Sequence, residues 1–326
     1  MRRTYLSLHG GSGGPRRRRG GVKTVEGTVV FKSSRNIRVE TPEGELLCSM
    51  RGRFRAAPNR VVAGDRVRVT RLQPGDGVLE EILPRRSEMR RASAGGKIVL
   101  VAANVDQLLI VLSAREPAPR WALVDRMLVA AECDGIEPII CLNKWDQVED
   151  SPEERRTLED VLAMYRALGF PAHALSAVRG AGLESLVGWL RGKTTALSGH
   201  SGVGKTTLLN KLYPGLDLAT REVNVVTGKG RHATTAVRLL KLPFGGYAVD
   251  TPGFREFQPV GLPRAELGRH YPEFREHVGR CRFNDCLHRE EPQCAVRSAV
   301  EGGLIPKMRY DNYLQILSSL SDAPQS

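Results

Sequence analysis

The sequence predicts a multidomain protein: a mostly parallel α/β domain, preceded by a small β-barrel and followed by a mainly helical metal-binding segment. Three observations support this organisation. Short β-type runs fill residues 22–84, strand and helix patterns alternate over 98–262, and three cysteines and a histidine cluster after residue 263. A chain of 326 residues also exceeds the usual size of one hydrophobic core, so two or three domains are expected.

Residues 1–21 combine glycines with the run from Arg16 to Arg19, which predicts a disordered basic arm. The arm either contacts RNA phosphates electrostatically or is a solvated extension. No stretch approaches the roughly 18 apolar residues of a membrane span, and the first residues lack the apolar core of a signal peptide. We therefore expect a cytoplasmic monomer with no membrane partner.

Five short β-type runs separated by turn residues follow in the segment 22–84. This pattern predicts a five-stranded barrel of the oligonucleotide-binding (OB) type. Arg66 and Arg68 alternate with Val67 and Val69, so both arginines are expected on one strand face. That face either contacts phosphate or carries charge for solubility.

The net charge of +13 is unevenly distributed. Residues 1–90 hold 20 Lys and Arg against 9 Asp and Glu, an excess of 11, which leaves +2 for the rest. The asymmetry indicates a polyanion bound mainly by the N-terminal part, although a solvated basic surface without a partner is the alternative. Only Phe31 and Phe54 in the barrel could stack on bases, so we expect recognition of folded RNA by shape and charge.

The basic segment 85–97 is interpreted as a linker into the next domain. Beyond it, alternating strands and helices predict a mostly parallel sheet flanked by helices. The expected strands are 97–103, 107–114, 136–142, 170–175, 194–197 and 246–250, and the expected helices are 119–134, 154–168, 183–190 and 206–212.

The string GHSGVGKT at 199–206 matches the phosphate-binding loop G-x-x-x-x-G-K-[ST]. Its glycines let backbone N–H groups point at phosphate oxygens, with the positive end of the following helix behind them. Lys205 is expected on the β- and γ-phosphates and Thr206 on Mg²⁺. An isolated match can be a plain glycine turn. The candidate nucleotide contacts here are Gly199, His200, Ser201, Gly202, Val203, Gly204, Lys205 and Thr206.

The string NKWD at 143–146 follows an apolar run of buried-strand type, at the strand end where ligands of α/β sheets bind. Asp146 could accept hydrogen bonds from the ring N–H and the exocyclic amine of guanine, a donor pair that adenine lacks. The motif therefore favours GTP over ATP, with a polar loop as the alternative. The candidate base-binding residues are Asn143, Lys144, Trp145 and Asp146.

Two further strings also follow predicted strands. SAV at 176–178 includes Ser176 and Ala177 and could place a backbone N–H on the guanine carbonyl. DTPG supplies Asp250 for water-mediated Mg²⁺ binding and the Gly253 N–H for the γ-phosphate. Four motifs, each at the end of a strand, together predict a GTP site.

The order of these motifs is unusual, because the guanine loop precedes the phosphate loop. A conventional small GTPase begins with the phosphate loop. The order therefore predicts a circularly permuted GTPase domain, which the proximity of domain termini at protein surfaces makes tolerable.

After Pro263 the sequence contains Cys281, Cys286, His288 and Cys294 within fourteen residues. Three thiolates and an imidazole form a closed tetrahedral set suited to one structural Zn²⁺, although the spacing alone also allows a chance cluster. The remaining cysteines, Cys48, Cys133 and Cys141, are expected to be small core hydrophobes. His270 and His277 are expected at the surface. An amphipathic helix is predicted at 308–320.

From about residue 22 to 320 the chain resembles the circularly permuted, ribosome small-subunit-dependent GTPases, the RsgA or YjeQ family. The resemblance implies a late-acting assembly factor that binds the small ribosomal subunit and its rRNA, hydrolyses GTP when the subunit stimulates it, and leaves. It rests on PRRSEMRR (84–91), AANVDQ (102–107), NKWD, GHSGVGKT, GRHATT (230–235), DTPGF (250–254) and the cysteine and histidine cluster.

Many GTPases place a glutamine after the D-x-x-G glycine to orient the attacking water, but this chain has Phe254 there. A phenyl ring cannot hold water by hydrogen bonds, so we expect slow turnover in the free enzyme. The resemblance implies that His232 is the catalytic substitute, with an ordinary loop histidine as the alternative. It also leaves open whether Thr234 or Thr235 is the further Mg²⁺ ligand.

We therefore expect a disordered arm at 1–21, an OB-fold RNA-binding domain at 22–84, a linker at 85–97, a permuted P-loop GTPase domain at 98–262 and a zinc-binding domain at 263–326. The expected function is GTP hydrolysis to GDP and phosphate during late small-subunit maturation. The first alternative is a GTP-gated RNA-binding switch whose hydrolysis is incidental. The second, an RNA-dependent ATPase, is disfavoured by Asp146.

Overall fold

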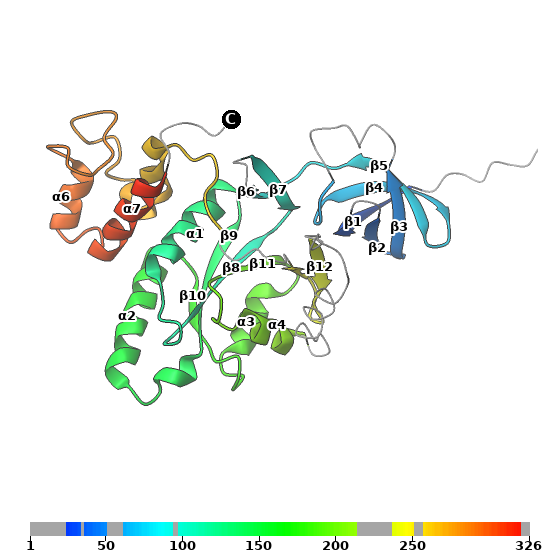
Figure 1. The fold of residues 1–326 in the computed structure, drawn as a ribbon, viewed down its shortest axis with the longest axis horizontal. Helices are drawn as coiled ribbons and strands as arrows, with labels where there is room; N and C mark the ends of the chain where they lie inside the picture. Colours follow the sequence, from blue (N-terminus) through cyan, green and yellow to red (C-terminus); the bar gives the residue numbers. More distant parts are fainter. Residues whose placement is uncertain are drawn as a thin grey trace, which may run out of the picture.

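The computed structural model describes residues 24–33, 36–50, 61–93, 97–213, 237–250 and 257–320. Three parts follow one another along the long axis of the molecule, with the β-barrel at one end, the C-terminal helices at the other and the main sheet between them (Figure 1). None of the helices in these ranges is both long and apolar enough to cross a lipid bilayer.

The N-terminal part is the expected OB-type barrel of five strands. Strand β3 pairs with β5 in parallel, and β4 pairs back with β1, so the sheet closes in the order β1-β2-β3-β5-β4. Alternation along each strand fills its core with Val29, Val39, Val67, Val69 and Leu79. The strands are β1 (Thr24–Lys32), β2 (Ile37–Thr41), β3 (Gly44–Met50), β4 (Arg66–Gln73) and β5 (Asp76–Ile82).

The predicted exposed face of β4 is confirmed, because Val67 and Val69 are fully buried while Arg66 and Arg68 point outward. Both arginines form ion pairs with Glu26, and Arg68 also pairs with Glu81. Carboxylates thus neutralise much of the charge on this face. Phe54, the second aromatic residue considered for base stacking, lies outside the described residues.

The central part is the expected α/β domain. The strands run in the order β10-β9-β8-β11-β13-β12, all parallel except β12, which is antiparallel to β13. They are β8 (Gln107–Ser113), β9 (Glu137–Asn143), β10 (Ala172–Ala174), β11 (Thr194–Ser198), β12 (Arg238–Lys241) and β13 (Tyr247–Asp250). Strand β12 was not predicted.

Helices cover both faces of this sheet (Figure 1), which explains why β8 is apolar at nearly every position. On one face Leu108 and Ile110 pack towards α1 and α2, and on the other Leu109 and Val111 pack towards α3 and α4. The helices are α1 (Trp121–Cys133), α2 (Pro152–Ala167), α3 (Leu183–Leu190) and α4 (Lys205–Leu212), with the short 3₁₀ helix η2 (Trp145–Val148) after β9.

One expected strand lies outside the main sheet. Strand β7 (Ile98–Ala103) forms where predicted, but it pairs with β6 (Glu88–Ala92) in an antiparallel two-stranded sheet, and one bridge joins its Ala102 to Ala63. Strand β6 occupies part of the segment interpreted as a linker. The β7 sequence suits a half-exposed hairpin, because Ala102 and Ala103 are buried whereas Ile98 and Val99 remain about 40% exposed.

The C-terminal part is mainly helical, as expected. It contains the 3₁₀ helices η3 (Arg264–His270) and η4 (Pro272–Phe274), followed by α6 (Ala295–Glu301) and α7 (Lys307–Ser319). Its core is aromatic and aliphatic and includes Tyr271, Phe274, Tyr313, Ile316 and Leu317. Helix α7 confirms the amphipathic helix predicted at 308–320.

Candidate functional site

The predicted nucleotide motifs converge at one edge of the main sheet. Strands β8, β9, β10, β11 and β13 are parallel neighbours, so their carboxyl ends lie at the same edge. Asn143 ends β9, Gly199 follows β11, and Asp250 ends β13. Ser176 lies two residues after the end of β10. This is the edge at which α/β sheets bind ligands.

The phosphate-binding loop connects β11 to α4 and passes close to β8. Gly199 has φ of +147°, and a Cβ there would lie 2.1 Å from the carbonyl oxygen of Val111, so only glycine fits. The ammonium of Lys205, the first residue of α4, donates to the carbonyl oxygens of Gly199 and His200 at 2.6 and 2.8 Å. The lysine is thus held over the loop that would surround the phosphates.

Asn143 connects three of the predicted motifs. Its amide nitrogen donates to the carbonyl of Val203 in the phosphate loop at 2.9 Å, and its amide oxygen accepts the backbone N–H of Ala177 at 3.0 Å. A Cβ on Gly204 would lie 2.4 Å from the Asn143 amide nitrogen, so only glycine fits at position 204. Asn143 is 2% exposed and fixes the phosphate loop relative to the base-binding loops.

The base-binding loops also contact each other directly. The Ser176 hydroxyl donates to the carboxylate of Asp146, and the Trp145 N–H donates to the carbonyl of Leu175 at 3.0 Å. Lys144 adopts a left-handed conformation with φ of 60°, which turns the chain from β9 into η2. These contacts orient the Asp146 carboxylate, the group expected to recognise guanine.

The Mg²⁺ and catalytic predictions are only partly covered by the structure. Asp250 lies at the carboxyl end of β13, as predicted, and is the register partner of Arg238 in β12. The predicted residues Gly253, His232, Thr234 and Thr235, and also Phe254, lie outside the described residues.

Ser198, the last residue of β11, belongs to this region although no sequence motif indicated it. Its side-chain oxygen accepts the backbone N–H of Phe257 at 3.1 Å, and both residues are fully buried. The contact ties the strand before the phosphate loop to the chain that follows DTPG. The only available signal was a hydroxyl residue at the end of an apolar strand.

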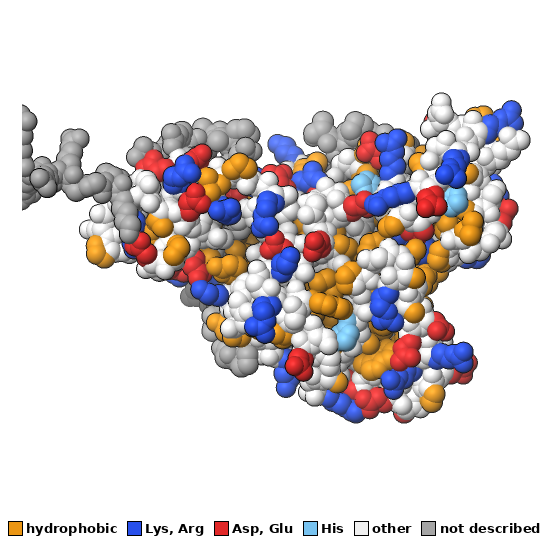
Figure 2. All heavy atoms as spheres, turned by 180° about the vertical axis from the view of Figure 1, so that it is seen from behind, with side chains coloured by type: hydrophobic (Ala, Val, Ile, Leu, Met, Phe, Trp, Pro, Cys, Tyr) orange, Lys and Arg blue, Asp and Glu red, His pale blue; other side chains and the backbone are white. Residues whose placement is uncertain are grey.

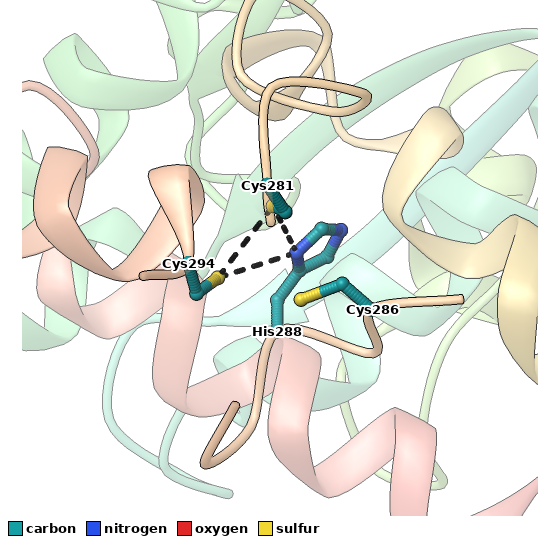
Figure 3. A group of neighbouring side chains, drawn as sticks. All are labelled: Cys281, Cys286, His288 and Cys294. Carbon is teal, nitrogen blue, oxygen red and sulfur yellow. Dashed lines mark hydrogen bonds between the residues drawn. The ribbon is translucent and has the colours of Figure 1, made fainter. Parts of the chain in front are cut away.

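The predicted metal ligands gather in the C-terminal part. Figure 3 shows the side chains of Cys281, Cys286, His288 and Cys294 facing one another, with their ligand atoms within 4.8 Å of each other. The Cys281 and Cys294 sulfurs lie 3.5 and 3.4 Å from Nδ1 of His288, and 3.9 Å from each other.

These distances fit a tetrahedral ion. Bonds of about 2.3 Å to sulfur and about 2.0 Å to nitrogen place two sulfurs about 3.8 Å apart, and sulfur and nitrogen about 3.5 Å apart. Burial lowers the pKa of His288 and thereby favours the neutral imidazole that binds metals. Tyr310 fixes the His288 backbone by donating to its carbonyl at 2.7 Å. The cluster can therefore hold a metal ion.

Two expectations about nearby residues were wrong. His270 is not a simple surface residue, because its ring lies 3.7 Å from the Cys133 sulfur and 3.5 Å from the Glu132 carboxylate. Cys133 packs beside the C-terminal core, but it is only partly buried and its sulfur contacts that polar ring, so it is not a fully buried core residue. The prediction holds for Cys48 and Cys141, which are buried.

Comparison with known proteins identifies what the chain is similar to. The family model "RsgA GTPase" matches residues 82–259. The "Small ribosomal subunit biogenesis GTPase RsgA" of Moorella thermoacetica is 39% identical over 296 residues, covering 91% of this chain and 97% of the relative. The protein of the same name from Azotobacter vinelandii is 40% identical over 321 residues, covering 98% and 90%.

Two solved structures share the fold. YjeQ from Thermotoga maritima superimposes with a TM-score of 0.77 at 35% identity, covering 91% of this chain and 99% of that one. YloQ, described as a circularly permuted GTPase, gives a TM-score of 0.74 at 30% identity, covering 93% and 97%.

Proposed function

The chain belongs to the RsgA GTPase family, and from this premise we propose that it hydrolyses GTP while bound to the small ribosomal subunit during late maturation. The names of the relatives supply the biological setting. The single observation that supports GTP binding at this site is the pair of hydrogen bonds formed by the Asn143 amide. They join the phosphate loop to the Ser176–Ala177 turn next to Asp146.

Nucleotide binding follows from the groups at the sheet edge. The N–H groups of the loop at Gly199, His200, Ser201, Gly202, Val203 and Gly204, together with Lys205, bind the phosphates. Asp146 binds the guanine edge and Ala177 its carbonyl, with Asn143, Lys144, Trp145 and Ser176 shaping the pocket. Thr206, Asp250 and one of Thr234 and Thr235 are the proposed Mg²⁺ ligands. Bound Mg²⁺ neutralises phosphate charge.

Hydrolysis requires a group that orients water, and Phe254 cannot supply it. We assign that role to His232, which the small subunit brings into place. The free enzyme is then slow and the subunit-bound enzyme fast. The γ-phosphate is held meanwhile by the loop, Lys205 and the Gly253 N–H.

The C-terminal cluster is proposed to hold one structural Zn²⁺. Its four protein ligands, Cys281, Cys286, His288 and Cys294, complete a tetrahedral set, so the ion stabilises the fold and leaves no open position for water. The proposed domain limits remain 22–84, 98–262 and 263–326. We also propose that the protein acts as a cytoplasmic monomer, since its partner is the ribosomal subunit.

The proposal is tested by GTP turnover with and without purified small subunits. We expect strong stimulation, and loss of most of it, on the order of ten- to a thousandfold, in His232→Ala with GTP affinity retained. Unstimulated turnover combined with GTP-dependent subunit binding would favour the GTP-gated RNA-binding switch. Loss of GTP binding in the variant would make His232 a structural residue.

A further inference from the structure

One row of exposed residues crosses from the barrel into the GTPase domain. Arg238 of β12 lies opposite Phe31 of β1. Phe31 in turn lies opposite Arg38 of β2, and Arg38 lies opposite Leu47 of β3. Residues directly opposite each other in a sheet point to the same face. The two arginines are exposed, Leu47 is 48% exposed and Phe31 is half-buried. Four strands give the row a length of about 14 Å.

The contacts within this row, here called the Arg–Phe row, combine aromatic and cationic groups. The guanidinium carbons of Arg238 and Arg38 lie 5.0 and 5.9 Å from the centre of the Phe31 ring. Arg38 is partly balanced by Glu45 at 3.4 Å, whereas in the described part of the chain no carboxylate forms an ion pair with Arg238. Arg238 therefore adds positive charge beside the ring, and its other register partner, Asp250, brings one carboxylate to the same strand face.

The row differs from the outward arginines of β4. The face in Figure 2 carries Lys and Arg side chains next to Asp and Glu side chains, so net charge alone does not mark a binding surface. On β4 the outward arginines are held by Glu26 and Glu81. In the row, by contrast, the guanidinium carbons of Arg38 and Arg238 lie over the Phe31 ring, and the exposed Leu47 is the next residue along the row.

The GTPase end of the row is fixed to the barrel by Glu40. Its carboxylate accepts hydrogen bonds from Lys241 in β12 and, at 3.1 Å, from the Tyr247 hydroxyl in β13. Burial and the neighbouring Glu40 charge raise the pKa of Tyr247 to about 12, so the hydroxyl stays a donor. These two hydrogen bonds hold the β12–β13 hairpin beside the barrel, where β12 pairs with β1.

We propose that the Arg–Phe row is an RNA contact surface shared by the two domains, which takes an unpaired nucleotide of the small-subunit rRNA. The inference rests on the proposed function. Guanidinium planes and a phenyl ring stack on bases, Leu47 adds apolar contact, and the cations meet the flanking phosphates. The number of aromatic residues in the sequence underestimates how well this surface can stack on bases, because the planar groups beside Phe31 are those of arginines.

Matched double variants test the proposal. Arg38→Gln with Arg238→Gln should weaken binding to small subunits, and to rRNA freed of protein, at least tenfold, and should reduce the slope of log affinity against log salt by about 1.4. Phe31→Leu should weaken binding several-fold with an unchanged salt slope. The control, Arg66→Gln with Arg68→Gln, removes the same charge and should weaken binding to small subunits and to rRNA by less than about twofold. GTP affinity and the melting temperature verify that each variant is folded.

Equal losses in the two double variants, or no loss in the row variant, would overturn the proposal. Weakened subunit binding with normal binding to protein-free rRNA would also contradict it, and would indicate a ribosomal protein as the partner. If the wild-type protein neither binds small subunits nor responds to them, the proposed function itself fails. If wild type and row variant both bind and respond, only the row inference fails.

Discussion

Asn143 shows how one amide holds a nucleotide site together. It uses its donor on Val203 and its acceptor on Ala177, so neither a purely accepting nor a purely donating side chain can replace it. The sequence identified Asn143 through NKWD but not this double role, because the partners lie 60 and 34 residues away. Only the folded sheet edge brings them together.

Replacing Asn143 with Asp should weaken GTP binding by about tenfold or more. The new carboxylate oxygen would face the Val203 carbonyl without a proton to share, a buried loss of about 1–3 kcal/mol. Titration with a fluorescent GTP analogue measures the effect. Gln147→Glu, in the same turn, is the matched control because that side chain acts as an acceptor from the Glu116 N–H. Equal affinities in the two variants would argue against the role of Asn143.

His270 gives a pH-dependent prediction. Its contacts with Cys133 and Glu132 raise its pKa to about 10, above its ordinary value near 6.5. Because the folded protein binds this proton more tightly than the unfolded chain does, protonation of His270 stabilises the fold. This contribution is complete below about pH 6.5 and is lost as the pH rises through about 10. His270→Gln should therefore lower the melting temperature more at pH 6 than at pH 10.

The control is His277→Gln, since in the described ranges the His277 side chain forms no hydrogen bond. Its effect should be small at both pH values. A loss that is independent of pH in His270→Gln would show that the ring contributes packing and not charge.

Among the elements, the spacing of apolar residues predicted those helices and strands whose buried face is apparent from their own sequence. Helix α3 has the expected limits, and the five barrel strands all form within the expected segment 22–84. The failures depend on tertiary contacts. The apolar pattern of β7 predicts a strand but not its partner, and β12 has only four residues, too short for a period to be recognised.

The metal cluster concerns the elements because it joins the loop that carries Cys281, Cys286 and His288 to Cys294 at the start of α6. Chelation, or Cys286→Ser, should remove about one zinc per chain and lower the melting temperature of the C-terminal part while GTP affinity is retained. Elemental analysis and calorimetry provide the measurements. His277→Ala, off the ligand pattern, should retain the metal. A fully folded, metal-free wild-type protein would rule out a structural ion.

At the scale of the whole molecule, buried polar contacts attach both outer parts to the central one. On the barrel side, the Asn104 amide donates to the Gly64 carbonyl at 2.9 Å, and Arg85 pairs with the fully buried Asp65 at 2.7 Å. A Cβ on Gly64 would lie 1.9 Å from the Ala103 carbonyl oxygen, so the two parts touch backbone to backbone. No sequence pattern indicated these contacts, because the Asn104–Gly64 bond joins two domains and the Arg85–Asp65 pair joins the barrel to the segment interpreted as a linker.

On the C-terminal side, Arg309 of α7 connects the metal-binding part to the GTPase domain. It donates to Asp125 of α1 and, at 2.6 Å, to Glu273, and the Arg309 and Asp125 side chains are no more than 1% exposed. The Arg309 guanidinium carbon lies 4.5 Å from the centre of the Tyr271 ring. One cation thus balances two buried carboxylates across the domain boundary.

Arg309→Met should therefore destabilise the protein by about 3–5 kcal/mol, because it leaves two buried carboxylates without their cation. Denaturant unfolding measures the loss, and Arg297→Met, at a half-exposed pair with Glu301, should cost less than about 1 kcal/mol. Adding Asp125→Asn and Glu273→Gln to Arg309→Met should restore part of the stability, since it removes the unpaired charges. If the triple variant is less stable than Arg309→Met, the penalty comes from lost hydrogen bonds and packing, and the charge argument is wrong.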